Sequence, residues 1–370
     1  MESDFPMAKG EGENSYMKNS RLQQKALFET KPVLEKALTQ VYSAVLPRNL
    51  VVGDLGCGSS ENTLIFVSKV INAMSGHPVG LQFFLNDLPT SDFNNIFRSL
   101  QHFKKSVLAD NNEETLPQFY VAALPGSYYT RLFPCQTVHF FHSSYCLHWR
   151  SRLPDGLYSN GRNIYIAKTT PLPVVKMYQE QFEKDFLLFL ELRHKELVFG
   201  GQMVLTFLGR KDEDVYNGSL NYLLEPLAQS LSSLVEKSCN EVQFWASHKQ
   251  GLVEEEKLNS FNGPFYGASV GEVKEVVKQS GLFDMNHIKL FEANWDPYDD
   301  SEDGNVQDSI QSGLNIAKCI RATTETLFVS HFGEFILDAL FKEYASKMAE
   351  YLERDEKKTH SVIILSLQRR

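Results

Sequence analysis

Two aspartates that follow apolar runs are the first residues in this chain that could do chemistry. Asp54 ends a β-branched run and is followed by a turn that contains Gly56 and Gly58. About one βαβ half-unit later, the apolar run 81–85 leads to Asp87. Glycines let the backbone approach a ligand, and the second acid can reach ribose hydroxyls at the carboxyl ends of parallel strands. This spacing therefore predicts a site for a nucleoside cofactor.

The same loop lacks the features that hold phosphates. It does not complete the G-x-G-x-x-G cradle, and the chain contains no G-x-x-x-x-G-K-[ST] motif. A cofactor with a ribose and no phosphate groups fits best, and S-adenosylmethionine is the commonest of these. A plain dinucleotide site and a purely structural turn between a strand and a helix are the alternatives.

Composition indicates a globular enzyme with no nucleic-acid or membrane partner. The 370 residues are 42% hydrophobic and 12% aromatic, and the net charge is -9, which disfavours nucleic acid and anionic membranes. Five cysteines without a C-x-x-C pair indicate buried thiols in a reducing compartment. No apolar segment near the N-terminus suggests a secretory signal, and no run of about 18 apolar residues suggests a membrane span. We therefore expect a cytoplasmic protein.

Strand-like runs alternate with helical segments along the chain. The expected helices cover residues 20–46, where Pro32 must kink or divide the helix, and residues 178–198. Alternation of this kind predicts an α/β fold with a mostly parallel, doubly wound sheet. The expected strands are residues 51–55, 81–85, 119–123, 137–142, 203–208 and 361–367.

The chain divides into two parts by composition. Residues 1–216 together with 351–370 contain the strand-like runs and would form a Rossmann-like domain that binds the cofactor. Residues 217–350 are mainly helical with polar breaks, which suggests a cap packed on the sheet that carries substrate-binding residues.

Sequence blocks along nearly the whole chain resemble the plant SABATH methyltransferases. The matching blocks are GENSYMKNSRLQ, DLGCGSSENT, FFLNDLPTSDFN, LPGSYYTRLFP, HSSYCLHWRS, GGQMVLTFLGR and FGEFILDALFKEYA. Members of this family use S-adenosylmethionine to methylate carboxyl groups of small acids or ring nitrogens of xanthines. The resemblance implies a Rossmann-like class I methyltransferase sheet with a helical substrate cap, often in a homodimer. Residues 238–250 are an insertion relative to the family pattern.

Position by position, the resemblance implies a set of cofactor-binding residues. One departure concerns the glycine loop, because members usually read DLGCSSGPNT where this chain reads DLGCGSSENT, with Glu61 in place of proline. Gly58 can restore the flexibility of the loop. The implied cofactor residues are Tyr16, Ser20, Asp54, Cys57, Asn62, Asp87, Leu88, Ser127, Tyr128, Ser143 and Cys146.

The resemblance is to the carboxyl-methylating branch, in which Gln23 and Trp149 would grip the substrate carboxylate. A carboxylate is already ionised at neutral pH, so attack on a sulfonium methyl group needs no general base. It needs an oxygen held in line about 3–3.5 Å from the methyl carbon. Neutral amide and indole N–H donors orient the anion without reducing its nucleophilicity as an arginine would.

The remaining pocket residues implied by the resemblance are mostly apolar, which suits a flat aromatic acid. They are Tyr16, Tyr145, His148, Leu223, Leu224, Tyr266, Ile320, Thr323 and His360. The block pattern is most similar to members that act on anthranilate, salicylate or benzoate, which implies a methyl ester, typical of plant volatiles, as product. His148 is assigned to hydrogen bonding with a ring substituent such as an ortho-amino or ortho-hydroxyl group. Leu224 and Ile320 leave an apolar slot that could instead admit jasmonate or indole-3-acetate.

Two further alternatives stay open. A xanthine N-methyltransferase is disfavoured because those relatives tend to carry asparagine where this chain has Gln23. The altered glycine loop suggests a catalytically inactive binder of small acids. Some members also hold Mg²⁺, and the counterparts of their residues are Asn160, Asn259, Phe261 and Asn262, with Asn259 replacing an acid.

Overall fold

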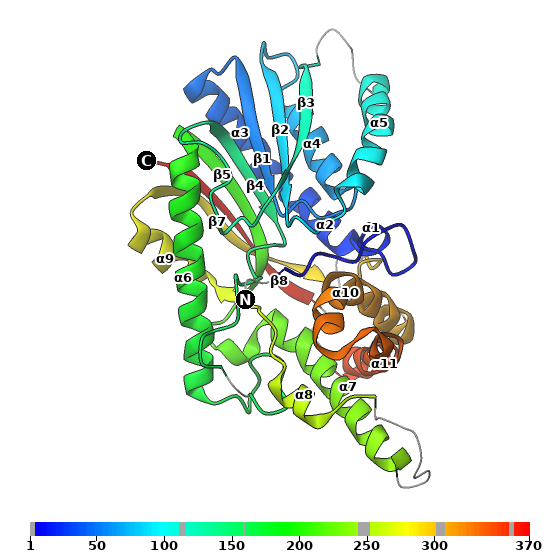
Figure 1. Cartoon of the computed structure of the whole chain (residues 1–370). Helices are drawn as coiled ribbons and strands as arrows, with labels where there is room; N and C mark the ends of the chain where they lie inside the picture. Colours follow the sequence, from blue (N-terminus) through cyan, green and yellow to red (C-terminus); the bar gives the residue numbers. More distant parts are fainter. Residues whose placement is uncertain (1–3, 111–115, 158–159, 243–251, 301–307, 355–358) are drawn as a thin grey trace.

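One twisted sheet with helices on both faces forms the centre of the molecule (Figure 1). The structure, a computed structural model, describes residues 4–110, 116–157, 160–242, 252–300, 308–354 and 359–370. The strand order is β3-β2-β1-β4-β5-β8-β7, and β6 pairs with β5. The strands are β1 (Asn49–Leu55), β2 (Gly80–Asp87), β3 (Phe119–Pro125), β4 (Val138–Ser144), β5 (Leu197–Arg210), β6 (Ala268–Ser269), β7 (Phe283–Asn294) and β8 (Thr359–Arg369).

The sheet is parallel from β3 to β5 and antiparallel at the β5–β8 and β8–β7 pairs. All six strands expected from the sequence are present. Asp54 pairs in register with Leu85, and Leu55 pairs with Asn86. The residues that follow β1 and β2 therefore meet at the carboxyl edge of the sheet, as their spacing predicts.

Helices cover both faces because the strands alternate their side chains between two cores. Met203, Leu205 and Phe207 of β5 belong to the larger core, which also contains the phenylalanines of α6. Val204 belongs to the smaller core with side chains of α3 and α4. The helices around the sheet are α1 (Tyr16–Asn19), α2 (Arg21–Glu29), α3 (Lys31–Val45), α4 (Asn62–Ala73), α5 (Phe93–Asp110), α6 (Leu172–Glu196) and α9 (Val270–Ser280).

The long N-terminal helix expected from the sequence is divided in two. The helix α2 ends at Glu29, and α3 begins at Lys31 with Pro32 in its first turn. Proline is tolerated at that position because the amide it lacks would have no partner within the helix.

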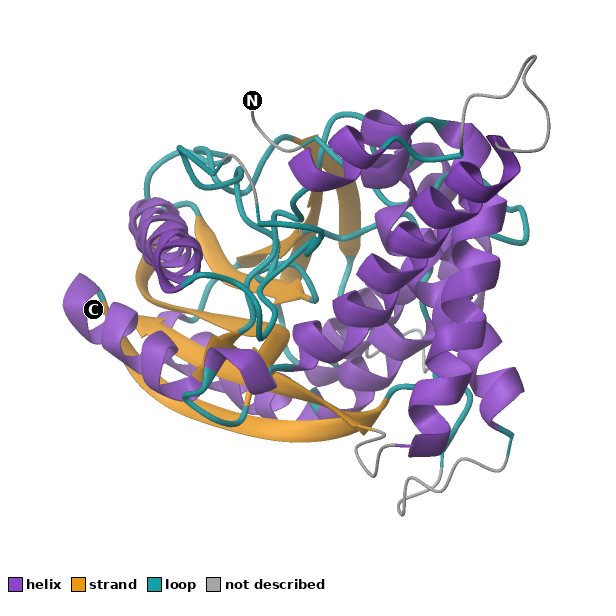
Figure 2. Cartoon of the chain, turned by 90° about the horizontal axis from the view of Figure 1, so that it is seen from below, coloured by secondary structure: helices purple, strands orange, loops and turns teal. Residues whose placement is uncertain are grey.

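A separate group of helices forms the cap beside the sheet (Figure 2). These helices are α7 (Ser219–Val242), α8 (Glu255–Ser260), α10 (Ser309–Phe332) and α11 (Leu337–Arg354), with short 3₁₀ turns at η1 (Val215–Asn217) and η2 (Glu334–Ile336). The segment 217–350 is not only cap, however, since β7 pairs with β8 over its whole length and belongs to the sheet. The residues 243–251 of the expected insertion lie outside the described residues.

Two other expectations concern membranes and thiols. None of the helices in the described ranges has the length and apolar character needed to cross a membrane. Cys57 and Cys319 are buried free thiols, Cys146 is partly buried, and Cys135 is exposed, so the expected burial does not extend to Cys135.

Candidate active site

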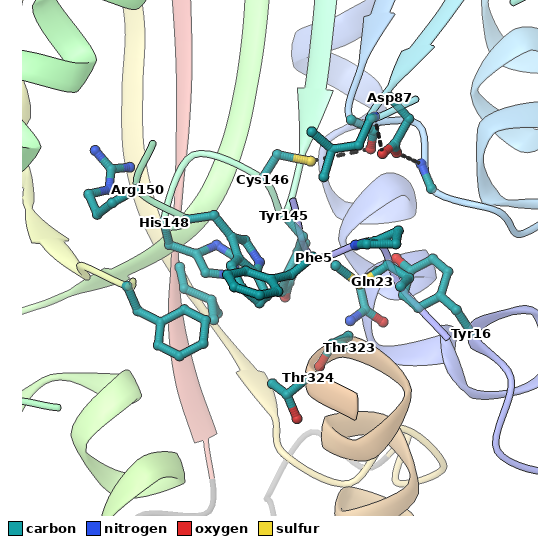
Figure 3. Close-up of a pocket in the computed structure, with 18 of the residues that line it drawn as sticks. Phe5, Tyr16, Gln23, Asp87, Tyr145, Cys146, His148, Arg150, Thr323 and Thr324 are labelled. Carbon is teal, nitrogen blue, oxygen red and sulfur yellow. Dashed lines mark hydrogen bonds between the residues drawn. The ribbon is translucent and has the colours of Figure 1, made fainter. Parts of the chain in front are cut away.

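A cavity of about 390 Å³ lies where the carboxyl edge of the sheet meets the cap (Figure 3). Its wall comes from the loops after β1, β2, β3 and β4, from α7 and α10, and from the N-terminal segment. Most of the predicted site residues meet here although they are far apart in the sequence. Those on the wall are Tyr16, Gln23, Asp87, Leu88, Ser127, Tyr128, Tyr145, Cys146, His148, Trp149, Leu223, Leu224, Ile320 and Thr323.

The loop after β1 needs its glycines. Gly56 and Gly58 have φ values of +71° and +67°, in the left-handed region. A Cβ at Gly56 would lie 2.2 Å from Cys146 Sγ, and one at Gly58 would lie 2.8 Å from the Tyr16 ring. The altered order of residues in this loop therefore keeps a close backbone approach to the cavity.

Asp87 at the end of β2 holds this loop in place. Its carboxylate accepts hydrogen bonds from the amides of Gly58 (2.7 Å) and Leu88 (2.7 Å) and from Ser91 Oγ (2.6 Å). Burial raises the pKa of Asp87, although these three donors act in the opposite direction. A carboxylate has about four acceptor positions, so one remains for a ligand.

Asp54 has a different environment from Asp87. Thr63 Oγ1 donates to its Oδ2 (2.6 Å), and His142 Nδ1 lies 2.7 Å from its Oδ1. The His142 ring stacks on Phe66 with 4.0 Å between centroids. Asp54 therefore stabilises the start of the loop and does not reach the main cavity. It lines a small adjacent cavity together with Cys57 and Asn62.

The two candidate carboxylate donors lie on the wall with their polar groups available. The Gln23 side chain is buried, and its only hydrogen-bond partner among the described residues is the Cys319 thiol, at 3.9–4.0 Å. That is a weak interaction for an amide. The Trp149 indole packs edge-on against Phe265, with 4.5 Å between ring centroids. In the described part of the chain no group hydrogen-bonds to the indole N–H.

His148 is a buried neutral imidazole beside Trp149. Its Nδ1 is buried without a hydrogen-bond partner in the described residues. Burial, and then the positive charge of Arg150, lowers the pKa of His148 to about 3. At neutral pH this side chain therefore carries one N–H donor and one acceptor nitrogen.

His360 lies behind the wall and not on it. Its Nε2 is 2.8 Å from the hydroxyl of Tyr145, and its ring lies against Trp295 with 4.5 Å between centroids. Burial lowers the pKa of His360 to about 3. Tyr145, which has a φ of +58°, does line the cavity, so His360 acts on the pocket through Tyr145.

Three other predicted residues also lie off the wall of either cavity. The Tyr266 hydroxyl donates to Glu272 (2.7 Å) and accepts from Arg210 (3.1 Å), so it belongs to a structural network. Ser143 Oγ donates to the carbonyl of Leu55, and the side-chain amide of Asn62 donates to the carbonyl of Ser20.

The residues expected for Mg²⁺ are three asparagines and a phenylalanine, so none of their side chains carries a negative charge. Asn160 already donates to the Tyr165 carbonyl and accepts from Thr170 Oγ1. Asn262 Oδ1 is a buried oxygen without a hydrogen-bond partner in the described residues. Magnesium prefers carboxylate and water oxygens, and the described ranges contain no group of three or more His, Cys, Asp or Glu side chains that could hold a metal. We therefore base no step of the reaction on a metal.

The sequence did not reveal several cavity residues, above all those of the N-terminal segment. Phe5, Pro6 and Met7 line the cavity, and Figure 3 shows Phe5 beside Tyr145. Two hydrogen bonds to α10 hold this segment, from Thr326 Oγ1 to the Pro6 carbonyl (2.7 Å) and from the Ala8 amide to the Ala322 carbonyl (2.8 Å). No local motif marks these residues. The other wall residues without a prediction include Arg150, Phe265, Trp295, Cys319 and Thr324.

A glycine loop and an acid at the ends of adjacent parallel strands define an α/β protein that binds a nucleoside cofactor. The model of the SAM-dependent carboxyl methyltransferase family matches residues 2–370, and the chain belongs to this family. It is 52% identical over 382 residues to anthranilate O-methyltransferase 2 of Zea mays, covering 100% of this chain and 98% of that protein. It is 51% identical over 387 residues to a Zea mays protein named inactive anthranilate O-methyltransferase 1, covering 100% and 98%.

The fold also matches a solved structure. Loganic acid methyltransferase with SAH superposes with a TM-score of 0.81 and 27% identity, covering 99% of each chain. The expected Rossmann-like methyltransferase fold, the enzyme class and the S-adenosylmethionine cofactor are thus confirmed.

Proposed function

We propose that this enzyme methylates the carboxylate of anthranilate or a similar ortho-substituted benzoate. The observation that carries the proposal is the neutral His148 imidazole, which lies in an apolar wall next to Trp149. A neutral imidazole nitrogen can accept a hydrogen bond from an ortho-amino group or donate one to an ortho-hydroxyl group. The similarity to the maize anthranilate O-methyltransferase supports the same choice.

The residues of the cavity fit S-adenosylmethionine, which supplies an electrophilic methyl group when bound. Gly56 and Gly58 leave a cradle that a side chain would fill. Asp87 retains one acceptor position for a ribose hydroxyl, and Ser127 and Tyr128 face the same space from the loop after β3. Leu88 adds an apolar contact on this side.

On the acid side, Gln23 and Trp149 would orient the substrate carboxylate. Their N–H donors are neutral, so they hold the anion without withdrawing its negative charge. Since the carboxylate is already ionised, no residue has to remove a proton. Leu223, Leu224 and Ile320 pack against the aromatic ring and exclude water.

Longer acids remain the second candidate because Leu224 and Ile320 form an apolar part of the wall. Jasmonate and indole-3-acetate could use this region for their larger carbon skeletons. They have no ortho-amino or ortho-hydroxyl group beside the carboxylate, so His148 would contribute little to their recognition.

Turnover with labelled S-adenosylmethionine and a panel of acids tests the proposal. We expect kcat/KM to be highest for anthranilate, then salicylate, and lower for benzoate, jasmonate and indole-3-acetate. His148→Ala should reduce the ratio of anthranilate to benzoate by about 2- to 10-fold, which corresponds to one hydrogen bond. The exposed His102→Ala is the matched control and should leave the ratio unchanged.

Two outcomes would overturn this assignment. Faster turnover of jasmonate or indole-3-acetate than of every benzoate would show that the apolar region determines specificity. Binding of S-adenosylhomocysteine without turnover of any acid would place the chain with its inactive relative. We further propose a cytoplasmic homodimer on the family resemblance, to be tested by cell fractionation and by light scattering of the purified protein.

A further inference from the structure

The loop after β3 carries two consecutive tyrosines that contact the acid-binding loop. The Tyr128 hydroxyl donates to the carbonyl of Cys146 (3.1 Å), and the Tyr129 hydroxyl donates to the carbonyl of Trp149 (2.7 Å). Both acceptors lie in the loop after β4, which also contains His148. One short segment therefore connects the cofactor side of the cavity to the residue proposed to hold the carboxylate.

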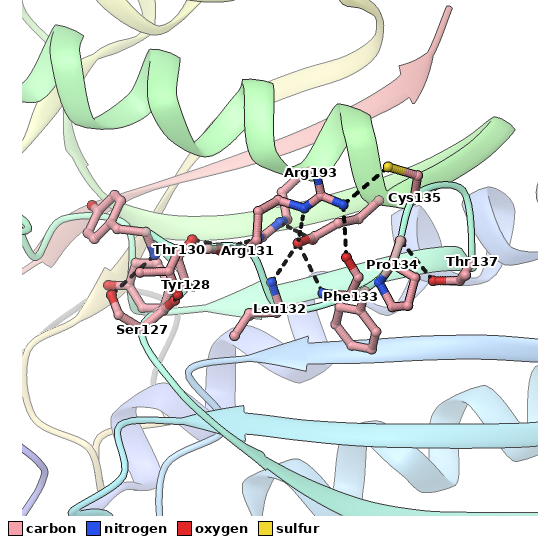
Figure 4. Close-up of polar contacts among 12 residues, drawn as sticks. Ser127, Tyr128, Thr130, Arg131, Leu132, Phe133, Pro134, Cys135, Thr137 and Arg193 are labelled. Carbon is pink, nitrogen blue, oxygen red and sulfur yellow. Dashed lines mark hydrogen bonds and ion pairs between the residues drawn. The ribbon is translucent and has the colours of Figure 1, made fainter.

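This segment is itself fixed from α6 by a buried ion pair (Figure 4). Arg193 donates to the carbonyls of Tyr128 (3.0 Å) and Thr130 (2.9 Å), on either side of Tyr129. Arg193 Nε lies 2.8 Å from Glu196 Oε2, and both side chains are 0% exposed. Glu196 Oε1 accepts from the amides of Leu132 (2.7 Å) and Phe133 (3.2 Å). The backbone that presents Tyr129 is thus held at four points.

Backbone hydrogen bonds also hold the main chain around Trp149. The Trp149 amide donates to the Cys146 carbonyl (2.9 Å). In the isolated β-bridge with Phe265, the Arg150 amide donates to the Pro264 carbonyl (2.8 Å) and the Tyr266 amide donates to the His148 carbonyl (2.8 Å). The bond from Tyr129 is shorter and comes from a different part of the fold, 20 residues earlier in the chain. Burial raises the pKa of the Tyr129 phenol, so its hydroxyl remains a donor.

We propose that Tyr129 is a positioning residue for methyl transfer, whose hydroxyl fixes the main chain of Trp149 and thereby the direction of its indole N–H. This inference rests on the proposed role of Trp149 in holding the substrate carboxylate. Tyr129 lies on the cavity wall, but it acts through Trp149. In-line transfer is sensitive to placement, since a misplacement of about 1 Å can reduce the rate about 100-fold.

The test is a double-mutant cycle on the full-length enzyme. Tyr129→Phe keeps the ring and removes only the hydroxyl, and Trp149→Phe removes the indole donor. We expect Tyr129→Phe to lower kcat/KM for anthranilate about 5- to 20-fold at saturating S-adenosylmethionine, with the Kd for S-adenosylhomocysteine within about 2-fold of wild type. In the Trp149→Phe background the same change should alter kcat/KM by less than about 2-fold, because its effect passes through the indole.

Two further variants separate positioning from a general loss of structure. Replacing Tyr129 by 4-aminophenylalanine restores a donor at the same place and should bring kcat/KM back to within about 2-fold of wild type. Tyr128→Phe removes the neighbouring hydroxyl on the cofactor side and should weaken the Kd for S-adenosylhomocysteine more than Tyr129→Phe does. Thermal unfolding of each variant reports on folding.

Three outcomes would overturn the role of Tyr129. These are wild-type kinetics for Tyr129→Phe, equal losses in the wild-type and Trp149→Phe backgrounds, and no rescue by 4-aminophenylalanine. If Trp149→Phe alone has wild-type kinetics, the role of Tyr129 falls with the carboxylate assignment while the methyltransferase activity stands. If wild type turns over no acid at all, the proposed function itself fails, which the acid panel shows separately.

Discussion

Replacement of Asp87 by asparagine should weaken cofactor binding through two effects at one position. The carboxylate receives three donors, from Gly58, Leu88 and Ser91, and keeps one acceptor position towards the cavity. Asparagine has one acceptor oxygen and one NH₂ group. If that oxygen takes the place of Oδ1, the amide of Gly58 faces an N–H₂ group and loses its partner. The glycine loop is then released, and the negative charge near the ribose site disappears.

The expected size follows from the hydrogen bonds. A bond to a charged group contributes about 1.5–3 kcal/mol, and a loss of that size for the ribose contact corresponds to about a 10- to 150-fold rise in Kd. Ser91→Ala is the matched control, because it removes one donor to the same carboxylate without touching the cavity wall. We expect Ser91→Ala to change Kd by less than about 3-fold.

Calorimetric titration with S-adenosylhomocysteine measures both variants. Thermal unfolding must first show that Asp87→Asn is folded at the titration temperature. A folded Asp87→Asn protein with a Kd within about 2-fold of wild type would show that neither the loop anchor nor the ribose contact contributes to cofactor binding. A loss equally large in Ser91→Ala would show instead that the carboxylate acts only as a loop anchor.

Three further predictions concern the acid site, the glycine loop and pH. Gln23→Ala and Trp149→Phe should each reduce transition-state stabilisation, measured through kcat/KM for the acid, by about 1–3 kcal/mol and leave the cofactor Kd unchanged. Wild-type kinetics in both variants would mean that the acid is held elsewhere. Gly56→Ala should lower the Tm and abolish cofactor binding because of the 2.2 Å contact with Cys146, whereas Gly76→Ala, with a φ of +78° in open space, should show only backbone strain. His148 and His360 have pKa values of about 3 when folded and about 6.5 when unfolded, so the unfolded state binds more protons and stability falls as pH drops below 6.5. The two histidines together should lower the free energy of unfolding by about 3 kcal/mol as the pH falls from 6.5 to 5. Denaturant titrations of a variant with glutamine at both positions should show a weaker dependence of stability on pH. An unchanged dependence would exclude these histidines as the cause.

Local patterns in the sequence were sufficient for most of the sheet. The strands that carry the cofactor loops are short β-branched or aromatic runs, and their positions follow from hydrophobic pattern alone. The strand β7 was missed because charged and apolar residues are mixed in FDMNHIKLFEAN, and only its pairing with β8 makes it a strand. Its role in the sheet depends on residues 359–369, which lie well beyond it in the chain.

Sequence motifs were enough to predict which loops surround the site, because they consist of glycine, aspartate and aromatic residues in a recognisable order. Which side chains face the cavity depends on how distant segments pack together. The Asp54 carboxylate contacts the His142 ring, which is 88 residues away in the sequence, and the His360 ring contacts the Tyr145 hydroxyl, 215 residues away. The N-terminal segment that brings Phe5 to the cavity is held by α10, where Thr326 Oγ1 donates to the Pro6 carbonyl 320 residues away. Such contacts leave no local pattern, since they form only when the folded chain brings distant segments together and each buried polar group takes the partner that packing provides.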